Sequence, residues 1–175
     1  MLRLMLLRHA KSDWSKPGQR DRDRALAPRG RSAAPQIGTY MARHKLVPDG
    51  VICSTALRTR QTWDLVAAAL PKAPAATFED ALYDADPDDI IDVIQATPKG
   101  VHSLLVLGHN PGLHEAANLL VASGELDARE RLREKLPTAG LAVIDFAFGS
   151  WDKVHPDSGR LDRFVVPRML EAATD

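Results

Sequence analysis

The chain has 175 residues, 45% of them hydrophobic, which fits one globular domain with a substantial core. Its 23 basic and 23 acidic side chains leave no net charge, which argues against nucleic acid or a membrane surface as a partner. A single cysteine excludes an internal disulfide and favours a reducing compartment. The apolar start is too short for a signal peptide and has no cleavage site, so we expect a cytoplasmic protein.

The first half of the chain alternates short apolar runs with helical periods. Residues 2–7 predict a central strand buried on both faces, whereas the polar residues 11–27 predict a loop. Pro28 is typical of a helix start, and the helix is expected to run to about His44. The elements expected next are a strand at 51–53, a helix over about 57–70, a linker at 71–76 and an edge strand at 77–83.

The second half repeats this alternation. Pro87 predicts the start of a helix that ends near Gln95, and residues 103–107 predict another buried strand. Asn110-Pro111 predicts the capped start of a helix that continues to about Ala122. A charged helix at 125–136 and strands at 141–148 and 161–166 complete the pattern. The sequence therefore predicts a single α/β domain over residues 1–175, with a mostly parallel sheet and helices on both faces.

Three predicted strands end in a turn that carries a histidine or an arginine. These turns are Arg8-His9, residues 54–58 and Gly108-His109-Asn110. In open α/β sheets, ligands bind where strands end and helices begin. Because neighbouring parallel strands end at the same edge of a sheet, we expect the three turns to meet in one site.

The residue types at these turns suit phosphoryl transfer. That reaction needs cations around the phosphate oxygens and a nucleophile in line with the leaving group. Arginine binds two oxygens at once, which makes Arg8 and Arg58 candidate phosphate ligands. A neutral imidazole attacks phosphorus when a hydrogen bond holds its other nitrogen, and His9 fits this role. His109 is suited to donate to a phosphate oxygen.

Each turn alone also has an ordinary structural explanation. Arg58 is equally typical of an exposed first helical turn, and His109 of a capped helix start. His109 and His114 are five residues apart, which is poor spacing for two metal ligands, and no acidic or thiol cluster joins them. We therefore expect neither a metal nor a cofactor. The histidines left with structural roles are His44, His102, His114 and His155.

Together, the three turns resemble the signature of the histidine phosphatase (phosphoglycerate mutase-like) superfamily. Residues 7–10 resemble its first histidine motif, residues 54–62 its Ser-x-x-x-Arg-x-x-Gln-Thr segment, and residues 108–110 its second histidine segment. The Arg-His-Ala-Lys-Ser start and the Gly-His-Asn-Pro-Gly-Leu segment are most similar to SixA-type phosphohistidine phosphatases. The resemblance implies a phosphoglycerate mutase-like fold. It also implies His9 as the phosphorylated nucleophile, with Arg8, Arg58 and His109 as the phosphate pocket.

The resemblance leaves some roles open. The family's spacing selects Arg58 over Arg60, which lies on the opposite face of the predicted helix. The family usually has a glutamate that donates a proton to the leaving group, and Asp84 is the nearest match to it in this chain. Asp84 is equally explained as a loop residue. Glu79 is a second candidate for the proton donor. Ser15 stands where the family has an asparagine, and is the candidate for that phosphate contact. A site with a poor proton donor suits phosphohistidine as the substrate. Imidazole is a good leaving group, because its conjugate acid has a pKa of about 6.5.

Several functions are compatible with this pocket. The first hypothesis is a phosphatase that hydrolyses phosphohistidine in a protein or peptide through an intermediate on His9. The alternatives are a phosphatase for small phosphomonoesters, or a non-catalytic module that binds phosphate or a phosphoprotein. A cofactor-dependent mutase is disfavoured, because such enzymes are longer and use the missing glutamate. The cationic loop 11–24 is a candidate surface for an acidic protein partner, and no pattern indicates an oligomeric state.

Overall fold

The fold is organised around one seven-stranded sheet. In the computed structural model, which describes residues 1–174, the strand order is β3-β2-β4-β1-β6-β7-β5. Strand β6 runs antiparallel to both of its neighbours, and the other neighbouring pairs are parallel. The strands are β1 (Leu2–Arg8), β2 (Gly50–Cys53), β3 (Thr77–Phe78), β4 (Ser103–Gly108), β5 (Val121–Gly124), β6 (Leu141–Phe146) and β7 (Gly159–Val165).

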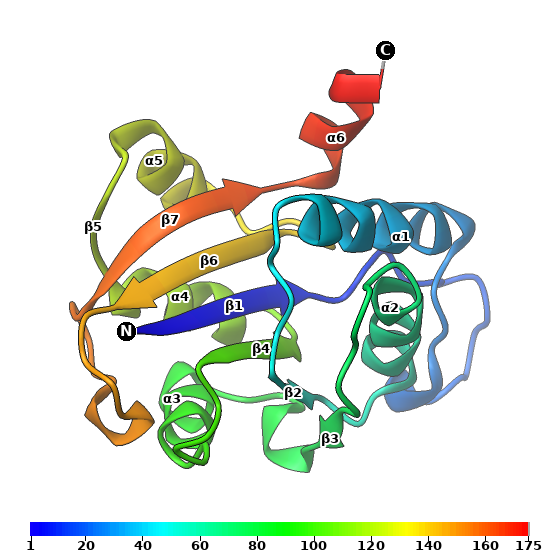
Figure 1. The fold of residues 1–175 in the computed structure, drawn as a ribbon. Coiled ribbons are helices and arrows are strands. Elements are labelled where there is room, and N and C mark those ends of the chain that lie inside the picture. Colours follow the sequence, from blue (N-terminus) through cyan, green and yellow to red (C-terminus); the bar gives the residue numbers. More distant parts are fainter. Residues whose placement is uncertain (175) are drawn as a thin grey trace.

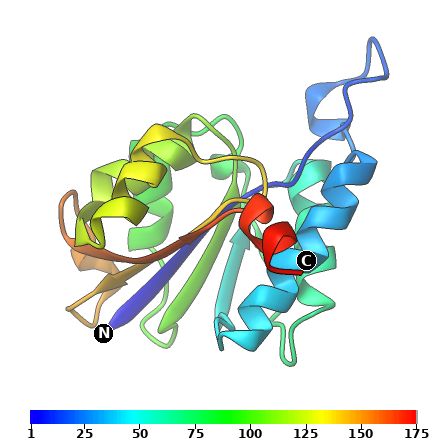
Figure 2. The same ribbon diagram turned by 90° about the horizontal axis from the view of Figure 1, so that it is seen from above.

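Helices cover both faces of this sheet (Figures 1 and 2). Leu4 and Leu6 of β1 pack with residues of α3, α4 and α5, whereas Met5 and Leu7 pack with residues of α1 and α2, where α6 also lies. The central strand is apolar from Leu4 to Leu7 because both of its faces are buried there. The helices are α1 (Pro28–Arg43), α2 (Leu57–Ala67), α3 (Pro87–Gln95), α4 (Gly112–Leu120), α5 (Leu126–Glu134) and α6 (Pro167–Thr174).

The predicted α/β architecture is confirmed, with a few local differences. The helix expected to reach Ala122 ends at Leu120, because residues 121–124 pair with β7 as the edge strand β5. The expected edge strand at 77–83 is two residues long and is followed by a short 3-10 turn. Asn110 does not cap α4; instead its side-chain nitrogen donates to the carbonyl of Leu136 at 2.8 Å. No helix in residues 1–174 has the length and apolar character to span a membrane.

The sheet brings the ends of β1, β2 and β4 together. These strands are neighbours and parallel, and their register pairs Arg8 with Gly108 and Cys53 with Leu107. The turns that follow the three strands therefore start from the same edge of the sheet, which is the arrangement that the sequence predicts.

Gly112 allows α4 to start close to the segment that follows Tyr83. A Cβ atom at Gly112 would lie 2.0 Å from the carbonyl oxygen of Ala85. We expect Gly112→Ala to push the two segments apart and to lower the free energy of unfolding by about 1–3 kcal/mol, measured by urea titration. Gly100→Ala is the matched control, because a Cβ there meets no atom within 4 Å. Equal midpoints for the two variants would contradict the close packing.

Candidate active site

The three turns place four of the predicted residues in one cluster. The ring centroids of His9 and His109 are 5.3 Å apart. His9, Arg58 and His109 are each less than 10% exposed, although they lie at the edge of the sheet. The charges of Arg8 and Arg58 act on both imidazole rings, which places all four side chains around the same space.

His9 is held in one protonation state. Its Nδ1 atom lies 2.8 Å from the carbonyl oxygen of Ala10. A carbonyl can only accept, so Nδ1 carries the ring proton and Nε2 keeps its lone pair. Burial lowers the pKa of His9 to about 4, and the charges of Arg8 and Arg58 contribute. At neutral pH His9 is therefore an uncharged ring with a nucleophilic Nε2.

His109 is held from the opposite direction. Its Nε2 atom lies 2.7 Å from the hydroxyl oxygen of Ser54, while its buried Nδ1 atom has no partner among the described residues. Burial, followed by the charges of His9 and Arg58, lowers the pKa of His109 to about 3. When the Ser54 hydroxyl donates to Nε2, the ring proton resides on Nδ1. The N–H of His109 then lies on Nδ1, the ring nitrogen without a partner among the described residues.

Arg8 and Arg58 differ in their hydrogen-bond partners. Arg8 donates through Nη1 to the carbonyl of Leu136 at 3.2 Å, and its buried Nε has no partner among residues 1–174. Burial and the charge of Arg58 lower the pKa of Arg8. Arg58 uses both terminal nitrogens on Asp21, with Nη1 2.7 Å from the backbone oxygen and Nη2 2.9 Å from the carboxylate. The guanidinium of Arg58 thus already binds an acidic group.

Asp21 is the residue that the sequence analysis missed. Its carboxylate also accepts from Arg24 at 2.9 Å and from the hydroxyl of Tyr83, whose ring meets His109 edge-on at 5.5 Å. The hydrogen bond from Tyr83 and the guanidinium of Arg58 lower the pKa of Asp21 to about 2. A carboxylate ion is therefore bound by donors that are suited to a phosphoryl group. From the sequence, the loop that contains Asp21, residues 11–24, is only a candidate surface for an acidic partner.

The Gln-Thr end of the second motif has a structural role. Gln61 accepts from the backbone N–H of Leu26 at 2.8 Å, which anchors the returning end of the loop. The hydroxyl of Thr62 accepts from the N–H of Ala10 at 3.0 Å and donates to the carbonyl of Arg58 at 2.7 Å. Helix α2 thereby fixes the His9 turn and the Arg58 turn relative to each other.

The other predicted candidates lie outside this cluster. Asp84 is exposed in the left-handed region, with φ 53°, and no hydrogen bond to its side chain is present in residues 1–174. Glu79 accepts from the N–H of Ala81 at 3.1 Å and caps a 3-10 turn. Ser15 is exposed, and its N–H donates to Asp13 at 2.8 Å. The described part of the chain has no group of three or more histidine, cysteine or carboxylate side chains placed to bind a metal.

The two buried histidines predict a loss of stability in acid. Their pKa values in the folded protein, about 4 and about 3, lie below the unfolded value of about 6.5. The unfolded chain therefore binds more protons as the pH falls from about 6.5 toward 4, and the free energy of unfolding decreases over this range. We expect the decrease to be shallower in a His9→Asn/His109→Asn double variant, measured by urea unfolding at several pH values. A slope equal to that of His102→Asn, an exposed histidine, would contradict the prediction.

The chain is similar to known proteins over most of its length. Residues 4–90 match the model of the histidine phosphatase superfamily, branch 1. An uncharacterized protein of Mycobacterium tuberculosis is 39% identical over 164 residues, which cover 93% of this chain and 100% of that protein.

Two solved structures are similar over nearly the whole chain. The candidate phosphohistidine phosphatase SixA from Agrobacterium tumefaciens superposes with a TM-score of 0.80 at 32% identity, covering 95% of this chain and 98% of that one. The corresponding candidate from Nakamurella multipartitia gives a TM-score of 0.81 at 30% identity, covering 95% and 96%. The chain therefore belongs to the histidine phosphatase superfamily, and within it to the SixA type.

Proposed function

We propose that this protein hydrolyses phosphohistidine in a protein or peptide through a phosphorylated His9. The observation that carries the proposal is the tautomer of His9: its Nδ1 lies against a backbone carbonyl, which leaves the lone pair on Nε2, and its ring lies 5.3 Å from that of His109. The similarity to two candidate phosphohistidine phosphatases supports the same substrate class.

The proposed reaction has two steps. In the first, the other ring nitrogen of the substrate imidazole takes a proton from solvent, Nε2 of His9 attacks phosphorus, and the bond from phosphorus to that imidazole breaks, so that it leaves as a neutral ring. In the second, water attacks the phosphorylated His9 and releases inorganic phosphate, which restores the free Nε2. Arg8, Arg58 and the Nδ1–H of His109 bind the phosphoryl oxygens in both steps. Asp21 has to leave Arg58 before the phosphoryl group can bind there.

The absence of a suitable acid beside His9 favours phosphohistidine over alkyl esters. Among the described residues of the cluster, the carboxylate is Asp21, and with a pKa of about 2 it holds no proton at neutral pH. Alkoxide leaving groups need a proton from a positioned acid, whereas the imidazole of phosphohistidine takes a proton from solvent on its other ring nitrogen and leaves as a neutral ring. Asp84 is exposed and stays a candidate proton donor for a leaving group that lies outside the buried cluster. Ser15 is also exposed, and a contact between Ser15 and phosphate requires movement of the loop at residues 11–24.

A cytoplasmic location is part of the proposal. Cys53 is buried in β2, and burial raises the pKa of its thiol to about 12. The thiol is therefore protonated and unreactive at neutral pH. The support for a reducing compartment is that a chain with one cysteine cannot form an internal disulfide.

Ser54 is predicted to assist catalysis through His109. Ser54→Ala removes the group that holds Nε2 of His109 and leaves either ring tautomer possible. We expect kcat to fall roughly tenfold, as for the loss of a single buried hydrogen bond, with a smaller change in KM. Steady-state kinetics on a phosphohistidine peptide measure both constants. Thr55→Ala is the neighbouring control, because Thr55 contacts Asp80 and Arg22 rather than His109.

The substrate class is tested by the leaving group. Wild-type protein is given a phosphohistidine peptide, p-nitrophenyl phosphate and a set of alkyl phosphate esters, including phosphoserine. We expect kcat/KM to follow leaving-group acidity, so that the first two compounds react and the alkyl esters do not. Faster turnover of alkyl esters would establish the small phosphomonoester alternative. Binding of inorganic phosphate without turnover of any compound would establish the non-catalytic alternative.

A further inference from the structure

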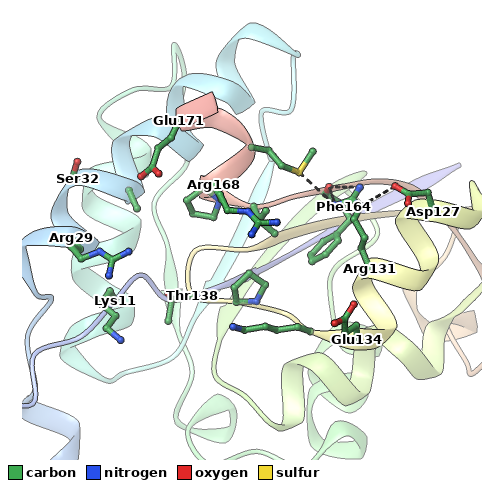
Figure 3. A pocket seen from close by; sticks show the side chains of 16 residues that line it. Lys11, Arg29, Ser32, Asp127, Arg131, Glu134, Thr138, Phe164, Arg168 and Glu171 are labelled. Carbon is green, nitrogen blue, oxygen red and sulfur yellow. Dashed lines mark hydrogen bonds and ion pairs between the residues drawn. The ribbon is translucent and has the colours of Figure 1, made fainter. Parts of the chain in front are cut away.

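A groove opens at the same edge of the sheet as the active site. Its volume is about 870 Å³, and it lies between the starts of α1 and α6 and the end of α5 (Figure 3). We call it the α1–α6 groove; the lining residues that matter below are Lys11, Arg29, Glu134, Lys135, Arg168 and Glu171. None of them belongs to the catalytic cluster.

The register of the sheet places this groove beside His9. Leu7 of β1 pairs with Leu141 of β6, which pairs with Val165 at the end of β7. Strands β1 and β7 run in the same direction, so their carboxyl ends lie two strand spacings apart, roughly 10 Å. The residues lining the groove include Val166, which follows β7, and Lys11, which lies two residues beyond His9.

One segment forms a wall of both places. The carbonyl of Leu136 accepts from Arg8 at 3.2 Å, and the N–H of Ala139 lies 3.0 Å from the carbonyl oxygens of Arg8 and His9. Pro137 and Thr138, between these two residues, line the groove. A polypeptide that presents a phosphohistidine to His9 therefore has the groove within reach of its flanking residues.

The groove is lined by basic side chains, most of which make no hydrogen bond or ion pair with other described residues. Its lining has five basic and three acidic side chains. Arg131 is bound internally, to Asp127 at 3.1 Å and to the carbonyl of Phe164. No side-chain hydrogen bond or ion pair within residues 1–174 involves the other four cations, Lys11, Arg29, Lys135 and Arg168, all of which are exposed.

The arrangement of these charges leaves the groove positive. The two remaining carboxylates are Glu134 and Glu171. Figure 3 shows Lys11 and Arg29 on the side opposite Glu134, with Arg168 near α6. Both arginines occupy the second position of a helix that begins with proline, where the helix dipole disfavours a cation. Helix stability therefore does not explain their presence.

The loop at 11–24 is a poorer surface for an acidic partner than the sequence suggests. Arg20 pairs with Asp23 and Arg24 with Asp21, each at 2.9 Å, and Arg22 pairs with Asp80. The arginines of that loop are thus engaged in the fold. Lys11, at the start of this loop, lines the α1–α6 groove instead.

We propose that the α1–α6 groove binds an acidic segment of the protein that carries the phosphohistidine. This inference rests on the proposed function and names the kind of partner that the same site serves. Exposed charges contribute little singly, so the groove acts through several of them and raises the encounter rate with an acidic surface. It thereby favours a protein substrate over a small phosphorylated molecule.

The test compares two phosphohistidine peptides of equal length, one with aspartate and glutamate around the histidine and one with serine and asparagine instead. We expect the Arg29→Glu/Arg168→Glu variant to raise KM for the acidic peptide roughly tenfold. Its KM for the neutral peptide and its kcat for both should stay unchanged. Increasing salt should remove the wild-type preference for the acidic peptide. The control is Lys99→Glu/Lys153→Glu, which changes exposed charges outside the groove.

A second measurement separates this inference from the proposed function. Fluorescence anisotropy follows the binding of labelled, unphosphorylated versions of the two peptides, so it needs no turnover, and circular dichroism verifies that each variant is folded. Weaker binding of the acidic peptide to the groove variant alone supports the groove. Equal behaviour of the groove variant and the control, in KM and in anisotropy, overturns it. Lack of hydrolysis with groove-dependent binding would overturn the proposed function and leave the groove assignment standing.

Discussion

Replacement of His9 by alanine is expected to remove the turnover of a phosphohistidine peptide, with kcat lower by roughly 10³-fold or more. The variant loses the atom that accepts the phosphoryl group, and the described cluster has no second imidazole in the same state. His109 cannot substitute, because its Nε2 is engaged by Ser54. The measurement is release of inorganic phosphate from the peptide under single-turnover conditions.

Trapping of the intermediate completes this test. Brief reaction of the wild-type protein with labelled substrate should leave phosphate on the protein, in a bond that is stable to base and lost in acid, as expected for a phosphorus–nitrogen bond. The His9→Ala variant should trap none. His102→Ala is the control, because His102 is exposed and its side chain makes no hydrogen bond within residues 1–174. Full activity of His9→Ala would rule out the two-step mechanism.

Replacement of Arg58 by alanine is expected to have the next largest effect, with kcat/KM lower by roughly 10²- to 10³-fold. Arg58 is less than 10% exposed and directs both of its terminal nitrogens into the site, where it binds Asp21. A phosphoryl group in its place would receive two charge-assisted hydrogen bonds. Arg58→Lys should restore only part of the loss, because an ammonium group cannot supply the planar pair of donors.

Arg60 provides the matched control for this prediction. It lies two residues further along α2, is exposed, and stacks over the ring of Phe78 at 4.4 Å. Arg60→Ala should leave kcat/KM within about twofold of the wild type, since it removes a surface charge of small effect. Similar losses in Arg58→Ala and Arg60→Ala would mean that the effect is one of general charge and not of contact with the phosphoryl group.

The sequence predicts those parts of the fold that depend on a strong periodic signal. The run of β1, apolar from residue 2 to residue 7 apart from Arg3, indicates a strand buried on both faces, and helix α3 has the predicted bounds because Pro87 marks its start clearly. Strand β5 has no such signal, because residues 121–124 are short and largely exposed, and their pairing with β7 is a long-range event. Helix α6 is also not predicted, because it is a short surface helix of eight residues with too few apolar positions to show a helical period.

The candidate site divides in the same way. His9, Arg58 and His109 could be found because each follows directly after a predicted strand, and the topology fixes where such residues lie. Asp21 and Arg24 could not be found, because a charged loop has no period that distinguishes a residue facing the site from one facing solvent. Ser54 appeared only as part of a motif, since its hydrogen bond to His109 joins turns 55 residues apart.

The pairing of Asp21 with Arg58 has a consequence for the end of the catalytic cycle. In the proposed cycle, the guanidinium of Arg58 exchanges inorganic phosphate for the carboxylate of Asp21, so product release leaves no unpaired buried charge. The affinity for phosphate is set by the difference between two ion pairs, and this difference is smaller than the strength of either pair. If the proposed function holds, we therefore expect inorganic phosphate to be a weak product inhibitor of this protein.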